Sequence, residues 1–195
     1  MFSEVAHVAI AASSGVGDIQ LHGIDVDLVK VGGSGVAAFT NPINHPTNAS
    51  DIFFDPEIKS LGNFLSQRLI EHELLHALGL LDVTSTMIQS GRNIASFTVL
   101  SDGLNPLNTV QLSLDLQLYD VGGLQYIYGP KSVAPGDTPY DSFSGVSRMF
   151  SIYDTSGVDT IDAGSISDNA LIDLRPGHFS SLGNNTSFTY EFVDE

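Results

Sequence analysis

The chain of 195 residues is long enough for one domain with a sizeable core. Its 23 acidic and 7 basic residues give a net charge of -16, which repels phosphate backbones and anionic lipids and makes nucleic acid and membranes poor partners. The absence of cysteine excludes disulfides, thiolate metal sites and cysteine nucleophiles. No segment reaches the roughly 18 apolar residues that span a bilayer, and the first residues lack the pattern of a signal peptide.

The first 55 residues are predicted to form short strands and loops. Phe2–Ala11, Ile19–Val31 and Gly35–Phe39 are rich in Val, Ile and Ala, and glycine clusters separate them. Apolar and polar residues alternate from Ile19 to Leu28, as a half-buried strand requires. The polar segment Asn41–Ser50 contains two prolines and is expected to be a loop.

A first helix is predicted to begin at Asp55-Pro56-Glu57, which supplies a cap, a proline and an acid in the first turn. The helical pattern continues to Leu80, with leucines recurring at a spacing of four. Gly62 can separate an early turn from the main helix, and Gly79 is a natural stop.

A second helix is predicted over Val110–Tyr128, after a loop-rich stretch that follows the first. It ends at Gly129-Pro130. From Lys131 onward the sequence changes to short strands separated by Gly, Asp and Ser turns. A domain boundary is therefore expected near Gly129.

The strongest functional signal is His72-Glu73-Leu74-Leu75-His76, on the first predicted helix. Two histidines at positions i and i+4 project from one helical face, so both imidazoles can bind one tetrahedral zinc ion. Glu73 is then expected to face a zinc-bound water, take its proton and pass it to the leaving amine. The alternative is an exposed helix with two solvated histidines.

A third zinc ligand must come from elsewhere in the chain. No glutamate occurs between Glu73 and Glu191, which argues against a glutamate ligand from a later helix. Gly79 lets the chain reverse after the helix, because a positive φ is open to it, and Asp82 can then reach the metal. Asp82 can instead be a surface acid at the end of the helix, and Asp102 is the reserve candidate.

The segment His72–Asp82 resembles the metzincin signature His-Glu-x-x-His-x-x-Gly-x-x-His/Asp, with Asp82 as third ligand. Histidine is usual at that position, and aspartate occurs in the snapalysin group. An aspartate adds negative charge to zinc and should make it a weaker Lewis acid. The resemblance also implies a methionine turn beneath the zinc, for which Met87 is the candidate. Serralysins carry a tyrosine two residues later, where this chain has Gln89.

The resemblance to serralysins extends over most of the chain. Leu118–Gly129 resembles the helix that closes their catalytic domain. Phe150–Asp162 resembles their Asp-x-Gly-Gly-x-Asp-Thr calcium segment, with Ser156 where glycine is usual. Phe2–Val5 and Ala37-Ala38-Phe39 resemble strands of the catalytic domain, and the latter resembles the rim strand that binds substrate by strand addition. The first long helix and the glycine-rich calcium repeats of the family have no counterpart in this sequence.

The family pattern also implies structural calcium in the C-terminal part. Asp154 and Asp159 lie five residues apart in a Gly/Ser turn and can supply the hard oxygen ligands that calcium prefers. The implied calcium ligands are Asp154 and Asp159 with Ala134, Gly136 and Thr138 in a first site, and Gly157, Asp159, Thr189 and Glu191 in a second. The alternative is an ordinary acidic turn.

The expected fold is α+β, with a mixed, twisted sheet of about four or five strands packed on two long helices over residues 1–129. A small β-rich segment follows at 130–195. The zinc is expected on the floor of a cleft, between the rim strand and the loop after Asp82. By resemblance the protein is a secreted monomer, with a polypeptide substrate and a proteinaceous inhibitor as partners.

Three functional hypotheses follow. The first is an active zinc endopeptidase. The second is a catalytically weak or inactive metzincin relative that acts as a metal-stabilised binding module, and it is motivated by Gln89, by Asp82 and by the absence of the family's first helix. The third is a calcium-stabilised structural module in which the histidines are incidental.

Overall fold

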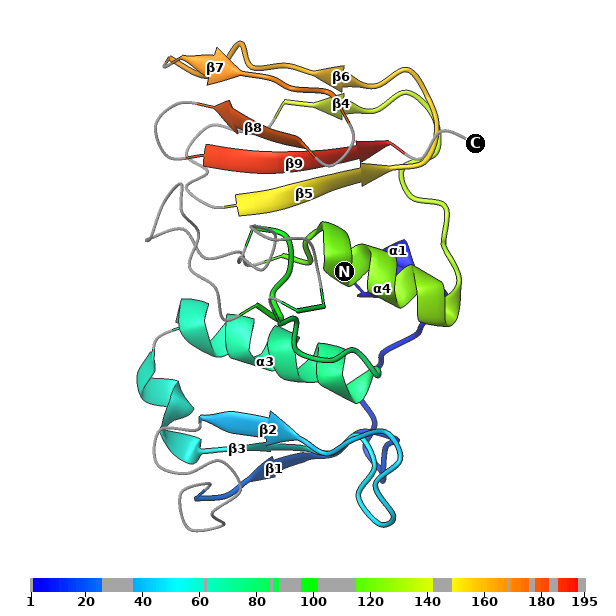
Figure 1. The fold of residues 1–195 in the computed structure, drawn as a ribbon, viewed down its shortest axis with the longest axis vertical. Coiled ribbons are helices and arrows are strands. Elements are labelled where there is room, and N and C mark those ends of the chain that lie inside the picture. Colours follow the sequence, from blue (N-terminus) through cyan, green and yellow to red (C-terminus); the bar gives the residue numbers. More distant parts are fainter. Residues whose placement is uncertain are drawn as a thin grey trace. The chain divides into compact units, whose positions relative to one another are not determined.

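The computed structural model describes the chain in several stretches. They are residues 2–25, 37–61, 63–84, 86–87, 96–101, 115–141, 149–167, 169–175, 178–182 and 186–192, with the main chain alone for 59–61, 63–65 and 186–192. The chain divides into two compact units, Ile10–Val83 and a second made of Met1–Ala9 with Thr84–Glu195 (Figure 1). Helices and small sheets occur together, so the chain is α+β. The specific metzincin arrangement and the boundary near Gly129 stay predictions.

The unit Ile10–Val83 contains a mixed sheet. Its strands are β1 (Leu21–Gly23), β2 (Ala38–Thr40) and β3 (Ile52–Phe54). The central strand β3 pairs in parallel with β1 and antiparallel with β2. The described part of the sheet therefore has three strands where about four or five were expected. Residues 26–36, on which two of the expected strands partly fall, lie outside the described residues.

The two faces of this sheet differ because side chains alternate along each strand. His22, Phe53 and Phe39 are register partners on the three strands. Their rings form a stack, with centroids 4.6 Å apart for His22 and Phe53 and 4.9 Å apart for Phe53 and Phe39. Thr40 and its partner Ile52 therefore point to the opposite face, where Ile52 is buried.

The first predicted helix is present as a 3-10 helix η1 (Pro56–Leu61) followed by α3 (Asn63–Ala77). The predicted start is supported by Asp55, whose side chain accepts the main-chain N–H of Glu57 at 2.8 Å. The helix ends at Ala77, three residues before the expected Leu80. The reason is Gly79, whose φ of 96° turns the chain away from the helix axis.

The second unit contains α1 (Phe2–Val5) and α4 (Leu118–Tyr128). The strand expected over Phe2–Ala11 is wrong at Phe2–Val5, which is helical. Long-range contacts determine this segment: the Val5 carbonyl accepts hydrogen bonds from Lys131 N and Gln125 Nε2, at 3.2 and 3.1 Å. Such contacts cannot be inferred from a local apolar pattern.

The expected start of the second helix at Val110 is also wrong, because α4 begins at Leu118. The residue before it, Gln117, is extended, with φ -100° and ψ 175°. Its main-chain N–H donates to Asp120 Oδ2 at 2.8 Å, which caps the helix there. Residues 110–114 lie outside the part of the chain that the structure describes.

Short strands follow α4, as the sequence predicts. They are β4 (Pro139–Tyr140), β5 (Met149–Asp154), β6 (Thr160–Ile161), β7 (Ala170–Leu171), β8 (His178–Leu182) and β9 (Thr186–Phe192). Strands β4 and β6 form a parallel pair, and the others form a sheet of order β5-β9-β8-β7. Met149, Ile152 and Leu182 are buried within this part of the unit.

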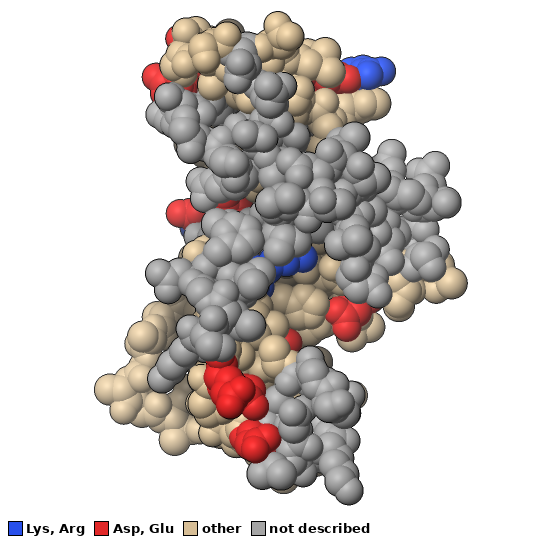
Figure 2. Space-filling model, turned by 90° about the vertical axis from the view of Figure 1, so that its left-hand side faces the viewer, with Lys and Arg blue, Asp and Glu red and all other residues tan. Residues whose placement is uncertain are grey.

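The surface reflects the acidic composition. Figure 2 shows acidic side chains at several places on one face of the molecule. Among the described residues, no helix is both long and apolar enough to cross a membrane.

Candidate metal centre

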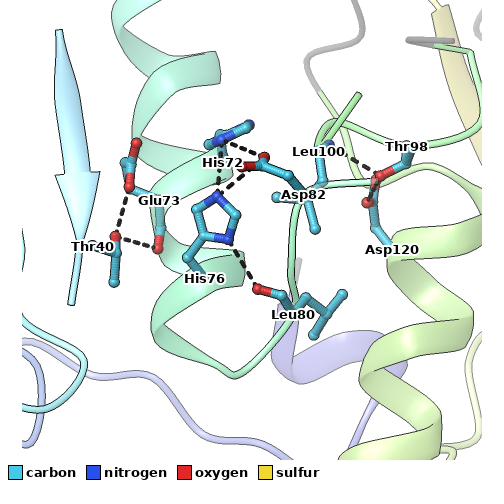
Figure 3. Close-up of polar contacts among 9 residues, drawn as sticks. All are labelled: Thr40, His72, Glu73, His76, Leu80, Asp82, Thr98, Leu100 and Asp120. Carbon is cyan, nitrogen blue, oxygen red and sulfur yellow. Dashed lines mark hydrogen bonds and ion pairs between the residues drawn. The ribbon is translucent and has the colours of Figure 1, made fainter. Parts of the chain in front are cut away.

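His72, His76 and Asp82 converge on one point in the unit Ile10–Val83 (Figure 3). Both histidines lie on α3, one turn apart. The two Nε2 atoms are 3.0 Å from each other, and Asp82 Oδ1 is 3.3 Å from each of them. The three atoms thus form a nearly equilateral triangle.

The size of this triangle fits zinc. Zinc binds histidine nitrogen and carboxylate oxygen at roughly 2.0–2.2 Å in tetrahedral sites, so two ligand atoms of one ion lie roughly 3.3–3.6 Å apart. The three separations of 3.0 to 3.3 Å come close to that edge length. Two imidazoles and one carboxylate are also a donor set that zinc uses. The residues present therefore fit a zinc ion with one position left open.

A hydrogen bond determines which ring nitrogen of His76 is left for a metal. His76 Nδ1 is 2.9 Å from the carbonyl oxygen of Leu80. A carbonyl oxygen only accepts, so Nδ1 carries a proton, and Nε2 is the ring nitrogen left to bind a metal. Nε2 faces Asp82 Oδ1 at 3.3 Å, and a cation bound there would interact favourably with both atoms. Without a metal ion, a shared proton must join these atoms instead: either His72 Nε2 donates a hydrogen bond to His76 Nε2, or His76 Nε2 donates one to Asp82.

The turn after α3 brings Asp82 back to the histidines. Gly79 has positive φ, and the N–H of Leu80 bonds the carbonyl of Leu75 at 3.0 Å, which closes the end of the helix. The same turn places the carbonyl of Leu80 against His76. One glycine thus positions both the third candidate ligand and the group that orients the second histidine.

Glu73 lies on the adjacent part of α3 and is directed at strand β2. Its side chain is buried, and its Oε2 accepts the hydroxyl of Thr40 at 2.6 Å (Figure 3). Thr40 Oγ1 also lies 3.0 Å from the main-chain oxygen of Glu73. The side chain of Glu73, the predicted general base, is therefore buried and hydrogen-bonded to Thr40 instead of being exposed to solvent.

The expected substrate-binding residues Ala37, Ala38 and Phe39 lie at and just before β2. Among the described strands, β2 forms one edge of the sheet β1-β3-β2. The carbonyl of Ala37 accepts the N–H of Asp55 at 3.0 Å, on the side of β3. Substrate binding by these residues stays a prediction.

Comparison with known proteins gives one partial likeness. No protein-family model matches the chain. A curated serralysin from Proteus mirabilis is 34% identical over 79 residues, which cover 34% of this chain and 16% of that protein. The likeness supports a distant relation to the serralysins. The chain spans less than one fifth of the length of that relative, so the activity of serralysin is a proposal for this chain.

The predicted methionine turn falls only partly on described residues. Met87 lies in a turn closed by a hydrogen bond from its N–H to the carbonyl of Thr84 at 3.0 Å, and its side chain is exposed. It belongs to the second compact unit, and its place beneath a zinc ion stays a prediction. Gln89 and the reserve ligand Asp102 lie outside the described residues.

The predicted calcium residues gather where the turn before β4 meets the turn after β5. Thr138 N–H donates to Asp159 Oδ1 at 3.0 Å, and Thr138 Oγ1 lies 3.2 Å from the carbonyl oxygen of Gly136 and 3.4 Å from that of Ala134. A Cβ on Gly157 would lie 2.3 Å from the Gly136 oxygen, so only glycine fits there.

Asp154 is fully buried at the same place. It accepts hydrogen bonds from Tyr140 Oη at 2.6 Å and from Ser156 N at 3.2 Å. The main chains of Thr189 and Glu191 lie on β9, opposite Ser151 and Tyr153 of β5. The side chains of Thr189 and Glu191 are not among the described ones, so the second calcium site stays a prediction.

Sequence reasoning missed two residues that organise these regions. Asp120 is fully buried and accepts three hydrogen bonds, from Thr98 Oγ1, Val99 N and Gln117 N. An acid three residues after a helix cap is a recognisable signal, and the expected helix start at Val110 concealed it. Thr40 had no local signal, since its role depends on the register of β2 against α3.

Proposed function

We propose that the chain is a zinc-dependent endopeptidase in which His72, His76 and Asp82 hold the metal and Glu73 is the general base. The carrying observation is the triangle of two imidazole nitrogens and one carboxylate oxygen, with sides of 3.0 to 3.3 Å. The distant relation to serralysin supports the same reaction class. Calcium as a structural second cofactor is proposed on the gathered turns at 134–138 and 154–159.

The roles of the chain's own residues follow from their contacts. Zinc, when bound, supplies a Lewis acid that polarises the scissile carbonyl and makes water easier to deprotonate. His76 is oriented by the hydrogen bond from its Nδ1 to the Leu80 carbonyl, which directs Nε2 toward the proposed metal position. Glu73 takes a proton from the attacking water and returns it to the leaving amine, so that the two halves of the peptide separate.

The substrate class is proposed to be an extended polypeptide. Strand β2 lies at an edge of the described sheet, and an extended peptide can add to such an edge through main-chain hydrogen bonds. The side chain of Thr40 connects this strand to Glu73. A peptide paired with β2 would therefore lie beside the strand whose Thr40 contacts the proposed base, Glu73. Secretion, a monomeric state and a protein inhibitor remain predictions of the serralysin likeness.

The test is cleavage of casein by the zinc-loaded chain and by Glu73→Gln. The substitution keeps the shape of the side chain and removes the proton acceptor, so we expect cleavage to fall by about 100-fold or more, the usual contribution of a general base. Zinc should stay near one equivalent per chain in both proteins. Glu57→Gln, an exposed glutamate on η1 of the same unit, is the matched control and should cleave like the wild type.

Three outcomes would reject the mechanism in different ways. Full activity in Glu73→Gln would show that another group moves the proton. Zinc binding by the wild type without cleavage of any peptide would favour the inactive, metal-stabilised binding module. Absence of zinc with a clear melting shift on adding calcium would favour the structural module.

A further inference from the structure

Thr40 and Glu73 form a short contact between strand β2 and helix α3. Thr40 Oγ1 is 2.6 Å from Glu73 Oε2, at the short end of the range for an O–H···O hydrogen bond. Glu73 is only 4% exposed, and a carboxylate removed from water needs a donor. Among the described residues, Thr40 supplies the hydrogen bond that Glu73 Oε2 accepts.

The sheet register determines where this hydroxyl points. Thr40 pairs with the buried Ile52 and lies on the face opposite the stack of Phe39 and Phe53. Main-chain hydrogen bonds anchor β2 at both ends, from Asn41 N to the Asp51 carbonyl and from Asp55 N to the Ala37 carbonyl, each 3.0 Å long. The sheet therefore fixes the main chain of Thr40, and its short side chain carries the hydroxyl close to that fixed point.

We propose that Thr40 is a positioning residue that aims the Glu73 carboxylate at the reacting water by holding Oε2, which leaves Oε1 to take the proton. The inference rests on the proposed peptidase function and deepens it. It also links the base to β2, the strand expected to pair with substrate. Displacement of β2 by a badly fitting peptide would then move the base.

Kinetics of Thr40 variants provide the main test. Thr40→Val keeps the shape of the side chain and removes the hydroxyl, whereas Thr40→Ser keeps the hydroxyl. With zinc loaded, we expect kcat of Thr40→Val to fall by about 10-fold or more, as on loss of an outer-shell partner. KM should change by less than about twofold, because substrate contacts stay in place. Thr40→Ser should restore most of kcat.

Controls separate positioning from folding. Zinc content and melting temperature are measured for every variant. Thr47→Val, in the exposed part of the loop after β2, changes a threonine in the same way and should leave kcat unchanged. Thr40→Ala removes the hydroxyl with a smaller side chain and gives the same test if valine is not accommodated.

A measurement that needs no catalytic activity tests the contact between Thr40 and Glu73. Carbon-13 labelling of the side-chain carboxyls gives signals for six glutamates, and the signal lost in Glu73→Gln identifies Glu73. We expect Thr40→Val to shift this signal and Thr40→Ser to leave it nearly in place. An unchanged Glu73 signal in Thr40→Val would overturn the proposal.

The outcomes distinguish this proposal from the proposed function. Cleavage by the wild type with undiminished kcat in a folded, zinc-loaded Thr40→Val would overturn the role of Thr40 alone. A loss of kcat that Thr40→Ser fails to recover would overturn it as well. No cleavage by the zinc-loaded wild type would remove the peptidase function and, with it, the positioning role.

Discussion

At the scale of single residues, the candidate site depends on which atoms carry protons. The Leu80 carbonyl fixes the proton of His76 on Nδ1, and this leaves Nε2 facing Asp82 Oδ1 at 3.3 Å. Asp82 is more exposed than either histidine, with 65% of its side-chain surface accessible. An exposed acid next to two histidines can be a surface acid or a ligand, and substitution separates these roles.

Asp82→Ala is expected to weaken zinc binding by more than the roughly 10–100-fold that loss of an outer-shell partner costs, because it removes a direct ligand. Asp82→His supplies a nitrogen ligand at the same position and should retain tight binding. Affinity is measured by competition with a coloured chelator. Asp18→Ala, an exposed acid of the same unit, controls for the loss of one negative charge. Equal affinity in Asp82→Ala and Asp18→Ala would identify Asp82 as a surface acid.

At the scale of elements, the helix of the metal site could be predicted in detail from sequence. The cap at Asp55 and the chain reversal at Gly79 are local signals, and sequence reveals them because a helix is stabilised by neighbours within four residues, although the predicted end at Leu80 lies three residues beyond Ala77. The reversal at Gly79 likewise predicts that Asp82 returns toward the histidines. The ligand roles themselves stay predictions.

Elements that depend on distant partners could not be predicted in this way. Phe2–Val5 reads as a strand but is a short helix, and its carbonyls bond Gln125 and Lys131, more than 100 residues away. Thr40 faces Glu73 because of strand register, which a one-residue shift would reverse. The start of α4 at Leu118 depends on the capping contacts of Asp120.

Asp120→Asn is expected to lower the free energy of unfolding by about 2–3 kcal/mol. The buried carboxylate accepts three hydrogen bonds, and in asparagine one of its two oxygens is replaced by an NH2 group, which cannot accept a hydrogen bond from the N–H and O–H groups that face it. Urea denaturation followed by circular dichroism measures the change. Asp162→Asn is the matched control: this exposed acid accepts one local hydrogen bond, from Gly164 N, and should cost less than about 0.5 kcal/mol. Equal stabilities of the two variants would show that Asp120 does not anchor the start of α4.

At the scale of the whole molecule, the two proposed ions belong to different compact units. The triangle of His72, His76 and Asp82 lies within Ile10–Val83, and the turns at 134–138 and 154–159 lie within the other unit. An ion that binds only the folded form stabilises the segment that binds it. The stabilisation increases with the ratio of the free ion concentration to the dissociation constant of the ion. Zinc and calcium should therefore protect different parts of the chain.

Hydrogen exchange followed by mass spectrometry tests this expectation. Zinc should slow exchange in the second half of α3 and in the turn at 78–82, and calcium should slow it at 133–140 and 154–160. Asp159→Asn should reduce the effect of calcium without altering that of zinc, because it removes the negative charge and one of the two oxygens of a proposed calcium ligand and leaves the other compact unit unchanged. Protection by calcium that survives both Asp159→Asn and Asp154→Asn would show that these acids are not its ligands.

The central claim is that His72, His76 and Asp82 hold one zinc ion. A crystal structure of the zinc-loaded chain, with anomalous data collected on both sides of the zinc absorption edge, tests it most directly. We predict a single zinc peak about 2.0–2.2 Å from His72 Nε2, His76 Nε2 and a carboxylate oxygen of Asp82. A zinc peak elsewhere, or no zinc peak beside the two histidines, would contradict the account.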